Sequence, residues 1–130
     1  MSSFPENLKY SKDHEWVKLE GGVIVMGISS YAVEQLGDIV FVDLPKVGDS
    51  ATAHAACGAV ESTKASSDLF SPVTGKVVEV NAALADSPEL VNQDPYEKGW
   101  MLKIELADPK ELDALMDAAR YAELVKAAGH

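Results

Sequence analysis

The chain has 130 residues, of which 47% are hydrophobic and 25% charged, and this length and composition predict one ordinary folded domain. Its formal net charge of −10 would repel phosphate backbones, so we expect no nucleic-acid partner. No apolar run approaches the length of a membrane span, so we also expect no membrane partner.

The first half of the chain alternates strand-like and turn-like stretches. Strands are predicted at residues 14–20 (HEWVKLE) and 22–28 (GVIVMGI), joined as a hairpin by a double glycine. A short helix is predicted at 29–37, where serine can cap the start and glycine can end it. Another strand follows at 38–45 and ends at a proline.

The second half continues the β pattern. Strands are predicted at 56–63 and 75–81, and the stretch DLFSP between them extends the same pattern up to a turn. Residues 82–99 are rich in Pro, Asn and Asp, which predicts an ordered long loop with one helical turn. The last strand is predicted at 100–106 (WMLKIEL).

The tail changes character at about residue 108. Asp108 can cap a helix, Pro109 suits its first position, and Glu111 is placed to close a capping box. One apolar helix face is predicted from the spacing of Leu112, Leu115, Met116 and Ala119. The whole chain, residues 1–130, is therefore predicted to be a single mainly β domain with its core at about 8–106 and a helical tail at about 108–128, packed outside the sheets. We expect a flattened barrel or sandwich of short antiparallel strands, with a short internal helix and a C-terminal helical segment.

The sequence contains few features that are associated with catalysis. The histidines His14, His54 and His130 lack metal-ligand spacing, and no nucleophile elbow, phosphate-binding glycine loop or zinc-protease motif is present. The single cysteine, Cys57, lies in an apolar strand-like stretch typical of a small buried side chain. We therefore expect neither an enzyme nor a metal site.

The stretch VESTKASSD places Lys64 between two strand-like segments. If those segments pair, Lys64 lies at the exposed connection, and its small neighbours leave the amine open to a modifying enzyme. A group attached there would project on a long flexible stem, as a swinging cofactor arm requires. On the local pattern alone, a lysine that only keeps the surface soluble is the more common case, because surface lysines in turns are frequent.

Four longer stretches strengthen the first interpretation: LKYSKDHEWV, GISSYAVEQLGDIVFVDLPKVG, GAVESTKASSDLFSPVTGKVVEVN and SPELVNQDPYEKGWMLKIEL. In their order and spacing they resemble the lipoyl carriers known as glycine cleavage H proteins, from about Leu8 to Leu124. The resemblance implies a lipoyl/biotinyl-carrier fold and lipoate bound covalently to Lys64. It also implies that Glu61 and Gly75 serve recognition or geometry around the attachment site, although a purely structural role is an equal alternative for each.

The resemblance further implies the function. The lipoyl arm would accept the aminomethyl group left when glycine decarboxylase, a pyridoxal-phosphate enzyme, acts on glycine. It would pass the group to an aminomethyltransferase and be reoxidised by dihydrolipoyl dehydrogenase, after lipoylating enzymes had attached it. The protein is then a carrier rather than a catalyst. Glu15 and Asp68 are proposed to line a cleft that holds the amine of the loaded arm, with a plain surface role as the alternative for Glu15.

Other carriers stay open as alternatives. Biotin carriers place methionine on both sides of the lysine, where this chain has Thr63 and Ala65. Lipoyl domains of other complexes, an H-like protein in lipoate relay and an unmodified scaffold are further possibilities. The opening MSSFPENLKY has features of neither a signal nor a transit peptide, so we expect a cytoplasmic protein, or a mitochondrial matrix protein if this is a mature eukaryotic chain.

Overall fold

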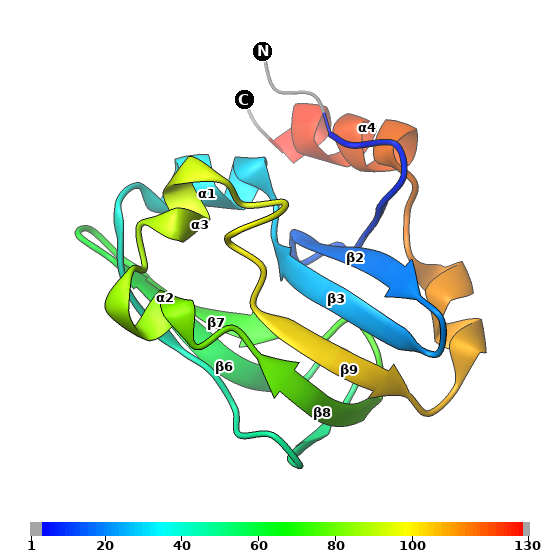
Figure 1. The fold of residues 1–130 in the computed structure, drawn as a ribbon. Coiled ribbons are helices and arrows are strands. Elements are labelled where there is room, and N and C mark those ends of the chain that lie inside the picture. Colours follow the sequence, from blue (N-terminus) through cyan, green and yellow to red (C-terminus); the bar gives the residue numbers. More distant parts are fainter. Residues whose placement is uncertain (1–3, 129–130) are drawn as a thin grey trace.

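The computed structural model describes residues 4–128, which form two antiparallel sheets with helices around them (Figure 1). The larger sheet has the strand order β1-β2-β3-β9-β8-β5, and the smaller has the order β4-β6-β7. The strands are β1 (Lys9–Tyr10), β2 (Glu15–Glu20), β3 (Val23–Ile28), β4 (Ile39–Asp43), β5 (Ser50–Ala51), β6 (Ala56–Ser62), β7 (Ser66–Phe70), β8 (Gly75–Val80) and β9 (Leu102–Leu106).

The predicted mainly β fold class is confirmed, in its sandwich form. No strand of the smaller sheet is hydrogen-bonded to a strand of the larger one within residues 4–128, so the sheets do not close into a barrel. Apolar side chains from both sheets fill the space between them. Ile24 and Met26 of β3, for example, share one buried cluster with Val60 of β6 and Leu69 of β7. β3 is buried at five consecutive positions, because its two faces contact the core between the sheets and the second cluster outside the larger sheet.

The β2–β3 hairpin turns at Gly21 and Gly22, as predicted, and Gly21 has the positive φ of 68° that a tight turn requires. The predicted internal helix is α1 (Ser30–Leu36). Its N-cap Ser29 accepts a hydrogen bond from the Ala32 amide, and the chain leaves the helix at Gly37. The two-residue strands β1 and β5 were not predicted, because two residues carry no readable alternation.

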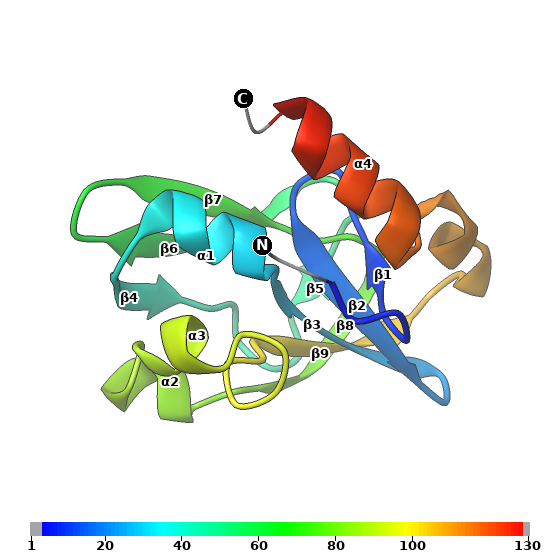
Figure 2. The ribbon, with the colours of Figure 1, turned by 90° about the horizontal axis from the view of Figure 1, so that it is seen from above.

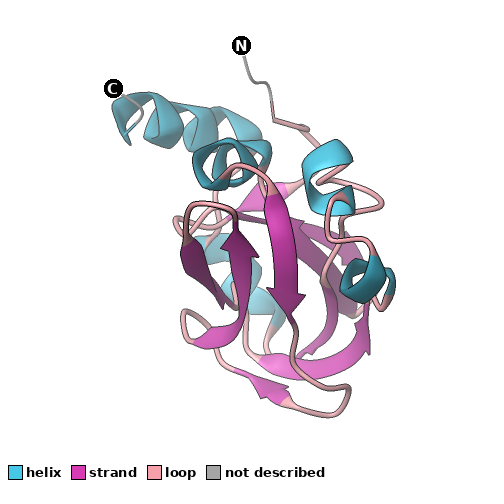
Figure 3. Cartoon of the chain, turned by 90° about the vertical axis from the view of Figure 1, so that its left-hand side faces the viewer, coloured by secondary structure: helices cyan, strands magenta, loops and turns pink. Residues whose placement is uncertain are grey.

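The stretch predicted as a loop with one helical turn contains two short helices, α2 (Ala83–Asp86) and α3 (Leu90–Gln93). Neither has a side-chain cap, so the usual start signal is missing. Leu84 of α2 and Val91 of α3 are buried in the core between the sheets, and this burial stabilises the two turns. The helices lie around the outside of the strands (Figure 3).

The tail departs from the prediction of one continuous apolar helix face. A 3-10 helix, η1 (Pro109–Ala114), is followed by an extended segment and then by α4 (Ala118–Ala128). Met116 lies in the break, where its amide and carbonyl both bond to the backbone of Tyr10 at 2.8 Å. Leu112 contacts the core between the sheets and Ala119 is exposed, so the four predicted positions do not share one face.

The predicted capping box at Glu111 is also wrong. Asp108 caps η1 through the Lys110 amide, but the Glu111 carboxylate accepts hydrogen bonds from the Thr74 amide at 2.6 Å and the Thr74 hydroxyl at 2.9 Å. A tertiary partner has therefore replaced the local one. The packing of α4 outside the sheets is as predicted: Tyr121 and Ala118 join Trp16 and Val25 in a second cluster on the outer side of β2 and β3.

Candidate functional site

The segments on either side of Lys64 pair as the antiparallel β6–β7 hairpin, with Glu61 opposite Ser66. Lys64 lies in the connection between the two strands, exposed and flanked by exposed Thr63 and Ala65. The hairpin turn projects from one end of the molecule, at the left of Figures 1 and 2. The prediction that Lys64 lies at the exposed tip of a hairpin is confirmed.

Ser62 shapes this turn. Its hydroxyl oxygen accepts hydrogen bonds from the Lys64 amide at 3.3 Å and the Ala65 amide at 3.0 Å, and its own amide donates to the Ala65 carbonyl at 2.8 Å. Thr63 is tied to the body of the protein, because its amide donates to the Asp38 carbonyl at 3.1 Å. The backbone beneath Lys64 is thus held in place while the side chain stays free. Serine is preferred in such turns, and this preference could have identified Ser62 from the sequence, but Ser62 was not predicted.

The other predicted residues of the attachment region lie at different depths. Glu61 is exposed on β6, opposite Phe41 of the neighbouring β4. Gly75 is the first residue of β8 and so belongs to the larger sheet, not to the sheet that contains the lysine hairpin. A Cβ at Gly75 would overlap the Glu105 carbonyl oxygen of the adjacent β9, so glycine permits this close approach of two strands.

A cavity of about 230 Å³ lies beside the hairpin and contains both carboxylates of the predicted cleft, Glu15 and Asp68. Four segments form its walls: the residues leading into β2, the end of β3, the helix α1 and the β6–β7 hairpin. The lining residues are Asp13, His14, Glu15, Ile28, Tyr31, Ala32, Gln35, Leu36, Val60, Ser67 and Asp68. The structure therefore brings Glu15 and Asp68 into one cavity although they are far apart in sequence.

Glu15 is 1% exposed, unlike Asp68, which is exposed. One carboxyl oxygen accepts a hydrogen bond from the Ser11 hydroxyl at 2.6 Å, and the other accepts from the Phe70 amide at 3.4 Å. Burial raises the pKa of Glu15 to about 8, and the two hydrogen bonds only partly oppose this rise. A neutral carboxyl group is therefore favoured in the empty cavity at neutral pH.

Lys64 reaches toward the helix that walls this cavity. A Cβ placed on Gly37 would lie 3.4 Å from Lys64 Cε, so the lysine stem runs past the end of α1. Leu36, the residue before Gly37, lines the cavity. Figure 2 shows α1 alongside the hairpin. A group extending from Lys64 starts next to the cavity that contains Glu15.

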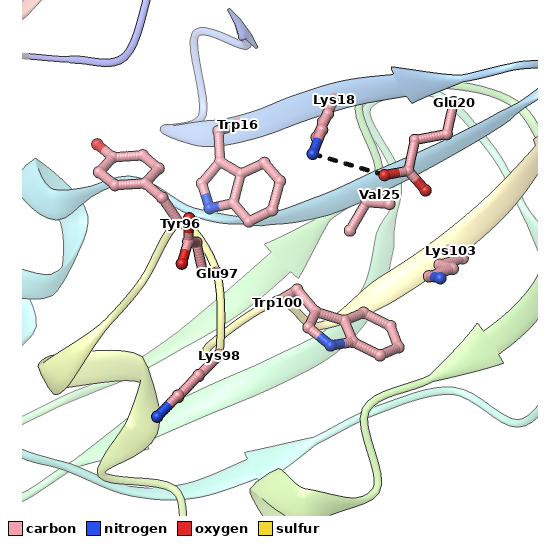
Figure 4. A pocket seen from close by; sticks show the side chains of 9 residues that line it. All are labelled: Trp16, Lys18, Glu20, Val25, Tyr96, Glu97, Lys98, Trp100 and Lys103. Carbon is pink, nitrogen blue, oxygen red and sulfur yellow. Dashed lines mark ion pairs between the residues drawn. The ribbon is translucent and has the colours of Figure 1, made fainter. Parts of the chain in front are cut away.

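A second, larger hollow of about 430 Å³ contains none of the predicted site residues (Figure 4). It lies over β2, β3 and β9 beside the loop before β9, and Trp16, Tyr96 and Trp100 supply its aromatic surface. Lys18 pairs with Glu20 at 3.6 Å, and Lys103 lies 5.4 Å from the Trp100 ring centre and 3.6 Å from Glu79. Two of its three lysines, Lys18 and Lys103, thus have acidic partners.

Three further observations restrict the roles that residues 4–128 can have. No group of three or more His, Cys, Asp or Glu side chains is arranged to hold a metal ion, and His130 lies outside the described residues. Cys57 is half-buried against the core between the sheets, and burial raises the pKa of its thiol to about 11. Of the helices described, none has the length and apolar character needed to cross a membrane.

A sandwich of two antiparallel sheets that displays a lysine at the turn of a surface hairpin is the architecture of lipoyl- and biotinyl-type carrier domains. The family model described as "Glycine cleavage H-protein" matches residues 8–128. The chain belongs to the glycine cleavage H-protein family, whose members are carrier proteins.

Individual relatives agree with this membership. The chain is 55% identical over 122 residues to the glycine cleavage system H protein of Anaeromyxobacter sp. (strain K), covering 94% of this chain and 95% of the relative. It is 56% identical over 123 residues to that of Brevibacillus brevis, covering 95% and 98%. The crystal structure of a glycine cleavage system H protein from Mycobacterium marinum superposes with a TM-score of 0.85 at 40% identity, covering 98% of this chain and 100% of that one.

Proposed function

We propose that Lys64 carries lipoate in amide linkage and that this chain is the lipoyl carrier of a glycine cleavage system. One observation supports the proposal most: the exposed lysine at the hairpin turn lies next to a cavity that contains a buried carboxyl group. The residues present fit a lipoyl arm. The lysine is free to be modified, and apolar side chains such as Ile28, Leu36 and Val60 can contact the arm's hydrocarbon chain.

When attached, the lipoyl group would supply a disulfide that accepts the aminomethyl group from glycine decarboxylase, delivers it to an aminomethyltransferase and is reoxidised by dihydrolipoyl dehydrogenase. The chain's own residues hold and shield the cargo. A cationic amine entering the cavity would meet the Glu15 carboxyl group, which is shielded from water, and Asp68. A nearby positive charge favours the ionised carboxylate, so docking of the amine would release the Glu15 proton.

The hairpin supplies what a lipoylating enzyme would recognise. The Ser62 hydroxyl fixes the turn that presents the Lys64 amine, and exposed Glu61 lies three residues before Lys64, near the end of β6. Gly75 lets β8 approach β9 closely in the larger sheet. We assign Lys64 the covalent attachment, Glu61 recognition and Gly75 geometry.

The experiment is intact mass and peptide mapping of protein produced in cells that lipoylate proteins. The parent is expected to carry one lipoyl increment on the peptide containing Lys64, and Lys64→Arg is expected to carry none. Arginine keeps the charge at an exposed turn, so the fold should tolerate it at a cost within about 0.5 kcal/mol. Lys76→Arg, at another exposed position, is the matched control and should be lipoylated normally. A lipoyl increment on Lys64→Arg would refute the assignment, and a biotinyl increment on the parent would favour the rival carrier class.

Two parts of the proposal concern context. We propose a cytoplasmic location in a bacterial cell, supported by the bacterial origin of the relatives named above. We propose no nucleic-acid partner, supported by the net charge of −10. Residues 1–130 are proposed to act as one carrier domain, with residues 1–3 and 129–130 outside the part that the structure describes.

A further inference from the structure

One side chain of the C-terminal helix reaches the walls of the Glu15 cavity without lining it. Tyr121 of α4 is fully buried. Its hydroxyl oxygen lies 2.8 Å from His14 Nδ1 and 2.6 Å from Ser29 Oγ. The two partners are 107 and 92 residues away in the sequence, so this is a long-range junction.

The two partners belong to different walls. His14 precedes Glu15 directly, and both line the cavity. Ser29 is the N-cap of α1, the helix that forms the second wall, and its hydroxyl oxygen also accepts the Ala32 amide at 3.3 Å. The β2–β3 ladder, which pairs Glu15 with Ile28, already joins these segments, and the Ser29 amide extends it by donating to the His14 carbonyl at 2.9 Å. The Tyr121 hydroxyl adds a side-chain link across the same junction.

His14 needs such a link more than an ordinary residue would. Its φ of 71° lies in the left-handed region, which a residue with a Cβ rarely adopts. The conformation directs the imidazole toward Tyr121 and toward Tyr31, whose ring centre is 4.9 Å away. Backbone strain of this kind persists only when surrounding contacts hold it in place, and it gathers at functional sites.

The Tyr121 ring is fixed independently of its hydroxyl. It stacks on Tyr10 with ring centres 4.6 Å apart and planes at 4°, and the Phe4 ring meets it edge-on at 4.7 Å. These contacts belong to the aromatic cluster outside β2 and β3, not to the cavity. The hydroxyl is therefore delivered to the junction by a rigid support, and phenylalanine in its place would keep that support.

We propose that the Tyr121 hydroxyl is a positioning group that holds the two walls of the Glu15 cavity at their working separation, and so keeps Glu15 aligned with the amine that the arm carries. The second half rests on the proposed function, whereas the first concerns only the folded chain. The competing view is that the hydroxyl merely fastens α4 to the body. The two views differ at the cargo, because only the positioning view requires release from the loaded arm to change when the hydroxyl is removed.

The decisive variant is Tyr121→Phe, and the chain offers a matched control. The Tyr96 hydroxyl bonds to the start of α1, the helix that Ser29 caps. Its oxygen accepts from the Ser30 amide at 2.9 Å and lies 3.0 Å from the Ser30 hydroxyl oxygen. Tyr96→Phe therefore removes a similar link to α1 but none to His14.

The first measurement uses protein without lipoate. Side-chain ¹⁵N resonances of His14, followed through a pH titration, report its tautomer and its pKa, which burial lowers in the parent. Amide hydrogen exchange at Ser29 reports the backbone link between the walls. Tyr121→Phe is expected to shift the His14 resonances and pKa and to speed exchange at Ser29, whereas Tyr96→Phe leaves His14 unchanged. Parental values in Tyr121→Phe, or equal shifts in both variants, would overturn the proposal.

The second measurement uses lipoylated and amine-loaded protein. Loss of one hydrogen bond of ordinary net strength predicts release of the cargo roughly two- to tenfold faster in Tyr121→Phe than in Tyr96→Phe. Unchanged release alongside a changed His14 would overturn the link to the arm. Absence of lipoate from the parent would instead defeat the proposed function. Should Tyr121→Phe not fold, Ser29→Gly breaks the same junction from the other side, since glycine is tolerated at an N-cap, and it must hasten release for the proposal to stand.

Discussion

Replacing Glu15 by glutamine should change how the stability of the protein depends on pH. Burial raises the pKa of Glu15 from its ordinary value of 4.5 to about 8 in the folded chain. The folded state therefore binds this proton more tightly than the unfolded state. It follows that the contribution of Glu15 to stability is complete below pH 4.5 and is lost as the pH rises through about 8.

The size of the effect follows from the two pKa values. At about 1.4 kcal/mol for each pKa unit, the full change amounts to about 5 kcal/mol, of which roughly 3 to 4 kcal/mol falls between pH 5 and pH 8. A glutamine side chain at this position would be neutral throughout. Its amide can donate to the Ser11 hydroxyl and accept from the Phe70 amide, so the two hydrogen-bonding positions stay occupied. We expect Glu15→Gln to gain stability relative to the parent as the pH rises.

The assay is urea unfolding of parent and variant at several pH values from 5 to 8, followed by the fluorescence of Trp16 and Trp100. His14 acts in the opposite sense. Burial lowers its pKa, so its contribution is complete above its ordinary value of 6.5 and is lost as the pH falls. Because both proteins contain His14, comparing them separates its effect from that of Glu15. If the free energies of unfolding of parent and variant changed in parallel from pH 5 to 8, the raised pKa of Glu15 and the shielding of its carboxyl group would both be refuted.

Two further predictions concern the larger sheet and the cavity. Gly75→Ala should destabilise the protein by about 1 to 3 kcal/mol in urea unfolding, because its Cβ would overlap the Glu105 carbonyl. Gly22→Ala, where nothing lies within 4 Å, is the control and should stay within about 0.5 kcal/mol of the parent; equal effects would contradict the close approach of β8 and β9. Asp68→Asn should leave lipoylation of Lys64 intact but speed release of the cargo amine, measured by mass spectrometry over time, and equal rates in variant and parent would remove Asp68 from the cleft.

Local signals were enough for most of the fold. The hairpin at Gly21–Gly22, the cap at Ser29 and the pairing around Lys64 each depend on neighbours in the sequence, and each was predicted correctly. The errors came where a distant partner displaced a local one. Glu111 had the position of a capping residue, but Thr74 holds its carboxylate. Met116 had helical spacing, but the backbone of Tyr10 holds it in an extended segment.

The candidate site divides in the same way. Lys64 could be singled out because its small neighbours and flanking strands are adjacent in the sequence. The burial of Glu15 could not be read from its strand, since only the folded chain brings Ser11 and Phe70 to its carboxyl oxygens. The link through Tyr121 joins residues from both ends of the chain, and no pattern within either end predicts it.

The junction at Tyr121 also has a consequence for the order in which the protein is made. The β6–β7 hairpin pairs residues between Ala56 and Phe70, so all of its strand partners have been synthesised well before the chain is finished. The Glu15 cavity is different, because the hydroxyl proposed to hold its walls lies on α4, which follows every strand in the sequence. Contacts of such long sequence separation form late in folding. The lysine turn can thus form before α4 has been synthesised, whereas the cavity beside it is completed only afterwards.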